Sequence, residues 1–173
     1  MDDNELNYII WQNRAFRFYL GARLLSLNEQ HSPSAFCSLQ AIESLMKGTL
    51  VYWDKSFNPE SNGHKMTGMV KAIRNKAKHG NDFQCPEYFY KDNRFQSVTR
   101  YPANGKGVGM PATLLKDLDH VFYNLVKLVP FQFNSELKRA LTGKNKKNLN
   151  ILRKNNSQIK KLRIFLNVRL HKT

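Results

Sequence analysis

Apolar residues recur every three or four positions in several long segments of the chain, which is the spacing of one face of an α-helix. The first segment predicts a helix of about 20 residues that begins near Asp3 or Asn4, either of which can cap it. The second begins at Ser32-Pro33, an N-cap residue followed by the proline favoured at the first helical position. The apolar stripes are Leu6, Ile9, Ile10, Phe16, Tyr19, Leu20, Leu24 and Leu27 in the first helix, and Ala35, Phe36, Leu39, Ile42, Leu45, Met46, Thr49, Leu50 and Trp53 in the second.

Two further helices follow after breaks in this pattern. The third comes after the turn-forming residues 58–63, and Gly80 suits the left-handed conformation that ends many helices, so His79 is expected in its last turn. The fourth runs from about Ala112 to near Pro130. Their stripes are Met66, Met69, Val70, Ile73 and Ala77, and Leu114, Leu115, Leu118, Val121, Phe122, Leu125 and Val126, and a short fifth helix is expected from Ser135-Glu136.

Residues 81–110 show no sustained period, and aromatic and basic side chains alternate along them. A long irregular segment inside a compact domain is more often functional or mobile than structural. Its glycine-rich part, residues 105–109, does not match a phosphate-binding loop, because no Gly-Lys-Ser/Thr follows and no strand precedes it.

After Gly143 the composition changes to Lys, Asn and Arg with interspersed Leu and Ile. The stripe predicts a basic amphipathic helix or helical pair, so the chain divides into a helical domain, residues 1–142, and a basic extension, residues 143–173. Two interpretations stay open: a helix docked by its apolar stripe with its lysines in water, or an RNA-facing surface. The stripe is Leu149, Leu152, Ile159, Leu162 and Leu166.

The net charge of +15 is concentrated in this extension. Twelve of the 28 Lys and Arg residues follow Glu136, the last acidic residue, whereas sixteen basic and thirteen acidic residues precede or include it. A single-sign block predicts a polyanionic partner, most economically nucleic acid, although an acidic protein or anionic lipid also satisfies it.

The remaining composition predicts a cytoplasmic protein without a cofactor. No charged and apolar leader precedes Leu6, Cys37 and Cys85 stand far apart, and apolar stretches end well before the roughly 20 residues that a membrane span needs. The histidines His31, His120 and His171 have no spacing that would hold zinc.

One short motif carries chemistry: Arg74, followed by the polar Asn75, lies five residues before His79. An arginine can hold a phosphate by two donors and stabilise the charge of the transition state, and a histidine can move the proton of a ribose 2′-hydroxyl. These are the groups that cleavage of a phosphodiester without a metal requires. A solvated basic helix face gives the same pattern.

Three segments resemble HEPN domains. Residues 34–48 contain Gln40-Ala41 followed by Glu43 and Lys47, a run similar to the second-helix pattern of that family. Gly63-His64 is similar to the step that opens the next helix, and residues 99–102, Thr-Arg-Tyr-Pro, resemble an element of the HEPN group encoded beside minimal nucleotidyltransferases. The resemblance covers roughly residues 30–130.

The resemblance implies an all-α, up-and-down four-helix bundle that acts as a homodimer, with paired copies of the family's Arg-x4-6-His ribonuclease motif in a cleft. It implies an endoribonuclease, a toxin or defence component, and an antitoxin or nucleotidyltransferase as partner. Many family members lack the Arg-His pair or place it after a later segment, so an inactive HEPN binding module is the alternative. A basic DNA-binding protein ranks last, because no helix-turn-helix is recognisable.

Other residues receive supporting roles in this hypothesis. Lysines near the motif would attract the RNA backbone, and residues of the Thr-Arg-Tyr-Pro element would bind phosphate and stack a base. Glu43 is expected either to orient Arg74 by an ion pair or to lie on the surface, and His64 either caps or packs the helix start or contacts substrate. The supporting RNA-binding set is Lys71, Lys76, Lys78, Arg100 and Tyr101.

Overall fold

The computed structural model describes residues 3–61, 63–77, 83–92, 111–129, 136–142, 146–162 and 164, and every described element is a helix or a connection between helices. The expected all-α class is therefore confirmed for this part of the chain. The helices are α1 (Asp3–Leu27), α2 (His31–Trp53), α3 (Met66–Lys76), α4 (Glu87–Tyr90), α6 (Leu114–Leu128), α7 (Glu136–Leu141) and α8 (Lys146–Arg153), with a further helical stretch at residues 158–162.

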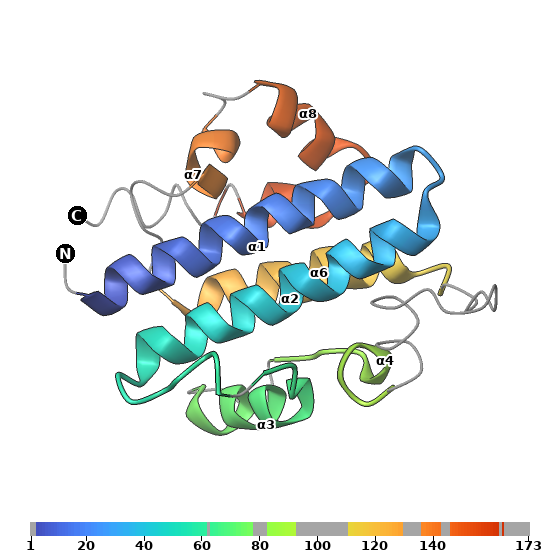
Figure 1. Ribbon diagram of the computed structural model, residues 1–173. Helices are drawn as coiled ribbons and strands as arrows, with labels where there is room; N and C mark the ends of the chain where they lie inside the picture. The colour runs from blue at the N-terminus through green and yellow to red at the C-terminus, as the bar shows by residue number, and fades with distance from the viewer. Residues whose placement is uncertain are drawn as a thin grey trace.

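The two longest helices, α1 and α2, form an antiparallel hairpin at the centre of the molecule (Figure 1). Every residue of α2 from Ser34 to Val51 is buried, apart from two partly exposed ones near its start. Gly48 allows the close approach of the hairpin, because a Cβ atom placed there would lie 2.9 Å from the Cβ atom of Trp11.

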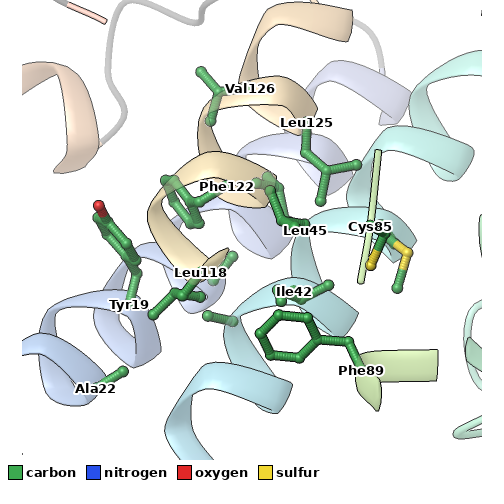
Figure 2. Packing of buried hydrophobic residues seen from close by; sticks show 14 of the residues in the cluster. Tyr19, Ala22, Ile42, Leu45, Cys85, Phe89, Leu118, Phe122, Leu125 and Val126 are labelled. Carbon is green, nitrogen blue, oxygen red and sulfur yellow. The ribbon is translucent and has the colours of Figure 1, made fainter. Parts of the chain in front are cut away.

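The core forms where α6 packs across this hairpin (Figure 2). The Tyr19 ring of α1 stacks on the Phe122 ring of α6 with a centroid distance of 4.1 Å. Side chains from α2, α4 and α6 complete the packing, so the short α4 contributes to the same core as the long helices. Members of this cluster in Figure 2 are Ala22, Ile42, Leu45, Cys85, Phe89, Leu118, Leu125 and Val126.

The second helix begins earlier than the sequence predicts. Ser32 was expected as its N-cap, but the helix starts at His31 after Gln30, and no side chain caps it. The reason is that the Ser34 backbone N–H already donates to the Gln30 carbonyl, so two helical residues, His31 and Ser32, precede Pro33. The Ser34 hydroxyl donates to the Ala22 carbonyl of α1 and ties the turn to the hairpin.

Part of the segment expected to be irregular is packed structure. Residues 83–92 contain the one-turn helix α4, and Phe83, Cys85, Phe89 and Tyr90 are buried. The prediction failed here because a single helical turn is too short to show a period. The glycine-rich residues 105–109 lie outside the described residues.

The described part of the basic extension is helical, as predicted, and it packs against the bundle. α8 contacts α1 and α7, and four of the five stripe residues are buried, three of them in the main core cluster. Docking by the apolar stripe is therefore confirmed for these residues, and what their lysines contact stays a prediction. The buried four are Leu149, Leu152, Ile159 and Leu162.

Candidate functional site

The candidate motif begins on α3, an amphipathic helix that packs against α2 and α4. Its buried face consists of Met66, Met69, Val70 and Ile73. The opposite face is basic and polar because the helix places Lys71, Asn75 and Lys76 in solvent, while Arg74 is half-buried between the two faces.

Arg74 is held in place by the segment that follows α3. Its Nε atom donates to the Phe83 carbonyl at 3.3 Å, and its guanidinium carbon lies 5.6 Å from the centroid of the Tyr90 ring. Arg74 forms no ion pair with any carboxylate of the described residues. The side chain is thus oriented by a neutral acceptor and an aromatic face, and its charge is left for a further anion.

The two exposed lysines of α3 differ in their surroundings. The Lys76 ammonium donates to Asp54 at 2.6 Å, and Ser56 donates to the same carboxylate. These hydrogen bonds, that of Lys76 first, lower the pKa of Asp54 to about 2. Lys76 is therefore partly neutralised at the end of α2, whereas Lys71 forms no ion pair with a described residue.

The expected position of His79 in the last turn of α3 is wrong, because the helix ends at Lys76 and Ala77 is extended with φ −67° and ψ 132°. Ala77 is the last stripe position, and its small side chain offers little apolar area to reward another turn. The backbone of His79 itself, and that of Lys78, Arg100 and Tyr101, lies outside the described residues. The geometry of the Arg74 and His79 pair stays a prediction.

Glu43 lies in a buried charged cluster on α2. It is 4% exposed, its Oε1 atom is 2.9 Å from the ammonium of Lys47, which is 7% exposed, and its two oxygens are 2.9 and 3.0 Å from His64 Nδ1. The Lys47 ammonium also lies 5.5 Å from the Trp11 ring centroid. Neither of the two roles expected for Glu43 is found: the carboxylate is buried rather than on the surface, and it contacts Lys47 and His64 rather than Arg74.

The cluster fixes the orientation of the His64 ring. An ionised carboxylate only accepts hydrogen bonds, so we assign the proton of Nδ1 to the bond with Glu43. The side chain is 56% exposed, which leaves Nε2 on the solvent side. A histidine held in this way can transfer protons at Nε2. His64 precedes α3 while Arg74 is in its last turn, about 12 Å further along the helix axis.

The sequence indicated Arg74, Glu43 and His64 but not the residues that hold them. Phe83 and Tyr90 reach Arg74 across a break in periodicity, which gives no signal in the sequence. The pair formed by Glu43 and Lys47 could be recognised in the sequence, because residues four apart share a helix face.

The thiols and metal-ligating side chains show no second reactive centre in the described ranges. Burial raises the pKa of the Cys85 thiol to about 12 and raises that of Cys37, so both thiols stay protonated at neutral pH. No group of three His, Cys, Asp or Glu side chains in this part of the chain could hold a metal ion.

Comparison with known proteins gives no match to any protein-family model, curated protein or solved structure. Among the described helices, none combines the length and the apolar character that crossing a membrane requires. The arrangement of α3 and the segment after it is therefore the main guide to function.

Proposed function

We propose that the protein is a metal-independent endoribonuclease of HEPN type whose reaction uses Arg74 and His79. The observation that carries this proposal is the state of Arg74. The Phe83 carbonyl and the Tyr90 ring orient its guanidinium, and no described carboxylate neutralises it. An oriented, uncompensated guanidinium on a basic helix face suits a phosphate.

The arrangement of the long helices is compatible with the same family. We assign α1, α2, α3 and α6 to the up-and-down four-helix bundle that the resemblance implies, with α2 as its buried helix. In this assignment, residues of the second-helix pattern face α1: Lys47, paired with Glu43, lies over the Trp11 ring, and Gly48 admits the close approach of Trp11.

The proposed reaction divides the chemistry between three residues. His79 removes the proton of the ribose 2′-hydroxyl, the oxygen attacks the adjacent phosphorus, and the bond to the 5′-oxygen breaks as the protonated His79 gives that oxygen a proton. Arg74 stabilises the negative charge on the pentacoordinate phosphate, and Asn75 orients the histidine or the RNA. The products carry a 2′,3′-cyclic phosphate and a 5′-hydroxyl.

A two-fold assembly accompanies this proposal. Leu6 and Ile10 lie one helical turn apart on α1 and are 51% and 57% exposed. A groove of about 590 Å³ beside them is lined by Ile10, Phe18 and three polar residues of the same helix. We propose that this face of α1 meets its copy in a homodimer. A toxin or defence role, with an antitoxin or nucleotidyltransferase partner, is proposed from the resemblance alone.

The direct test is incubation of the purified protein with RNA in EDTA, followed by analysis of the fragment ends. Cleavage that survives the chelator and leaves cyclic or 3′-phosphate ends supports the proposal. A strict requirement for a divalent cation, or 3′-hydroxyl ends, contradicts the mechanism.

An inactive HEPN binding module is the second candidate, because the contacts of Arg74 also suit a purely structural role. A guanidinium that holds the Phe83 carbonyl and packs on Tyr90 has a structural role, and a structural arginine needs no reaction to explain it. In that case RNA or an acidic partner binds without being cleaved, and Arg74→Ala lowers the free energy of unfolding without affecting any activity.

A further inference from the structure

The outer face of the C-terminal region carries six exposed cations in sixteen residues, 146–161. None of them forms an ion pair with a residue in the described ranges, and the sequence contains no acidic residue after Glu136. Leu149, Leu152 and Ile159 of the same region are buried, and Ile151 is partly exposed. We call this face the C-terminal basic surface; its cations are Lys146, Lys147, Arg153, Lys154, Lys160 and Lys161.

A buried polar network fixes this surface to the bundle. Arg23 of α1 is completely buried, and its Nη1 atom lies 2.5 Å from both carboxylate oxygens of Asp119 on α6. The same guanidinium donates through Nε to the Ile151 carbonyl at 3.2 Å and through Nη2 to the Lys154 carbonyl. Arg23 therefore joins α1, α6 and the end of α8.

Tyr19 extends the network to the segment after α8. Its hydroxyl donates to Asp119 at 2.6 Å and accepts from the Asn156 side-chain amide at 2.8 Å. A buried ion pair is retained only where its remaining hydrogen-bonding groups are satisfied, and here backbone carbonyls of the C-terminal region satisfy them. The cations thus lie on a fixed helical scaffold. Because the scaffold is already ordered, binding a ligand costs less conformational entropy.

The chemistry of the surface favours a nucleic-acid backbone over the other polyanions. A helix that binds lipid needs a free apolar face to insert, and the stripe of this region is already buried in the core. Protein interfaces have aromatic and apolar centres, and the described part of this surface offers only Ile164 as an exposed large hydrophobic residue. Separate ammonium groups surrounded by Asn, Ser and Gln suit phosphates.

We propose that the C-terminal basic surface is a nucleic-acid-binding site that recognises the phosphate backbone. It is separate from the α3 region, because α8 lies against α1 and α3 against α2, on opposite sides of the hairpin (Figure 1). The proposal does not rest on ribonuclease activity, since a protein without cleavage would still bind through this surface. Its role is to retain the strand while another part is free to reach α3.

The experiment compares two pairs of neutralised lysines in the full chain, each on a His79→Ala background that prevents cleavage. The first pair, Lys147→Gln with Lys160→Gln, removes charge from the C-terminal basic surface. The control pair, Lys65→Gln with Lys116→Gln, removes two exposed lysines elsewhere. All four side chains are exposed, so both proteins are expected to fold, which circular dichroism melting checks.

Binding is measured by fluorescence anisotropy with a labelled 20-nucleotide single-stranded RNA and a DNA of the same sequence, over a range of salt concentrations. Each lost phosphate contact lowers the slope of log affinity against log salt by about 0.7 and weakens binding at 0.1 M salt about fivefold. We expect about a 25-fold loss for the first pair, equal for RNA and DNA, and a much smaller loss for the control pair.

Equal losses of affinity in the two pairs would overturn the proposal, because binding would then depend on the net charge of the protein and not on where the lysines lie. A loss of affinity for only one of the two nucleic acids would also overturn it. So would a first pair that keeps the salt slopes of the unsubstituted lysines but no longer binds vesicles of phosphatidylserine and phosphatidylcholine. The last result would reassign the surface to a membrane.

Discussion

At the scale of single residues, two charged side chains are defined by partners that are distant in the sequence. Arg74 is oriented by Phe83 and Tyr90, and Arg23 by Asp119 and two carbonyls of the C-terminal region. The sequence identified Arg74 through its spacing from His79. Nothing in the sequence distinguishes Arg23 from a surface arginine, because only the packing of α6 and α8 around it makes it buried.

The buried cluster around Glu43 provides the prediction at this scale. Glu43→Gln leaves the Lys47 ammonium without its buried counter-charge, so we expect the free energy of unfolding to fall by about 3 kcal/mol. His64→Gln removes a half-exposed partner and should cost less than about 1 kcal/mol. Urea unfolding measures both variants. Equal losses would show that the histidine, rather than the lysine, is the energetically important partner of the carboxylate.

At the scale of elements, the long helices and the short helices α7 and α8 could be predicted, whereas α4 and the end of α3 could not. The stripes of α1, α2 and α6 repeat over several turns, and the structure contains all three. The end of α3 was misplaced because a glycine shows that a helix stops before it, but not how many residues before it the helix ends. The one-turn α4 and the packing of α8 depend on contacts with other helices.

Two glycines in helices test the close packing of the hairpin. Gly48→Ala places a methyl group 2.9 Å from the Trp11 Cβ atom and 3.3 Å from the Tyr8 ring, so overpacking should outweigh the helix propensity gained. We expect a net loss of about 1–2 kcal/mol in the free energy of unfolding. Gly68→Ala on α3 meets no atom within 4 Å and should gain up to about 1 kcal/mol. Thermal or urea unfolding measures both, and stabilisation by Gly48→Ala is the contrary result.

At the scale of the whole molecule, the bundle separates two charged regions with different architecture. The α3 region is a basic helix face with one oriented arginine, and the C-terminal basic surface is anchored by the network of Arg23 on the other side of the hairpin. The charge of the C-terminal region was evident from the sequence. Its attachment was not, because an amphipathic stripe does not reveal which surface it will cover.

The assembly prediction belongs to this scale. Light scattering should give a dimer mass, and Ile10→Asp should shift it to a monomer, because the change puts a charge into the exposed apolar face of α1. Lys116→Gln, on α6, is the control and should leave the mass unchanged. A wild-type monomer at working concentration that still cleaves RNA would contradict a cleft composed of two subunits.

The cleavage of RNA by histidine variants in EDTA tests the central claim most directly. We expect the wild-type protein and His64→Gln to cleave with similar rates. His79→Ala should lose about 100-fold or more in rate through loss of the proton-transfer group. Arg74→Lys should also cleave poorly, because an ammonium cannot form the bidentate contact. Full activity of His79→Ala would contradict the account. If His64→Gln rather than His79→Ala abolished cleavage, the proton-transfer group would be the histidine beside Glu43.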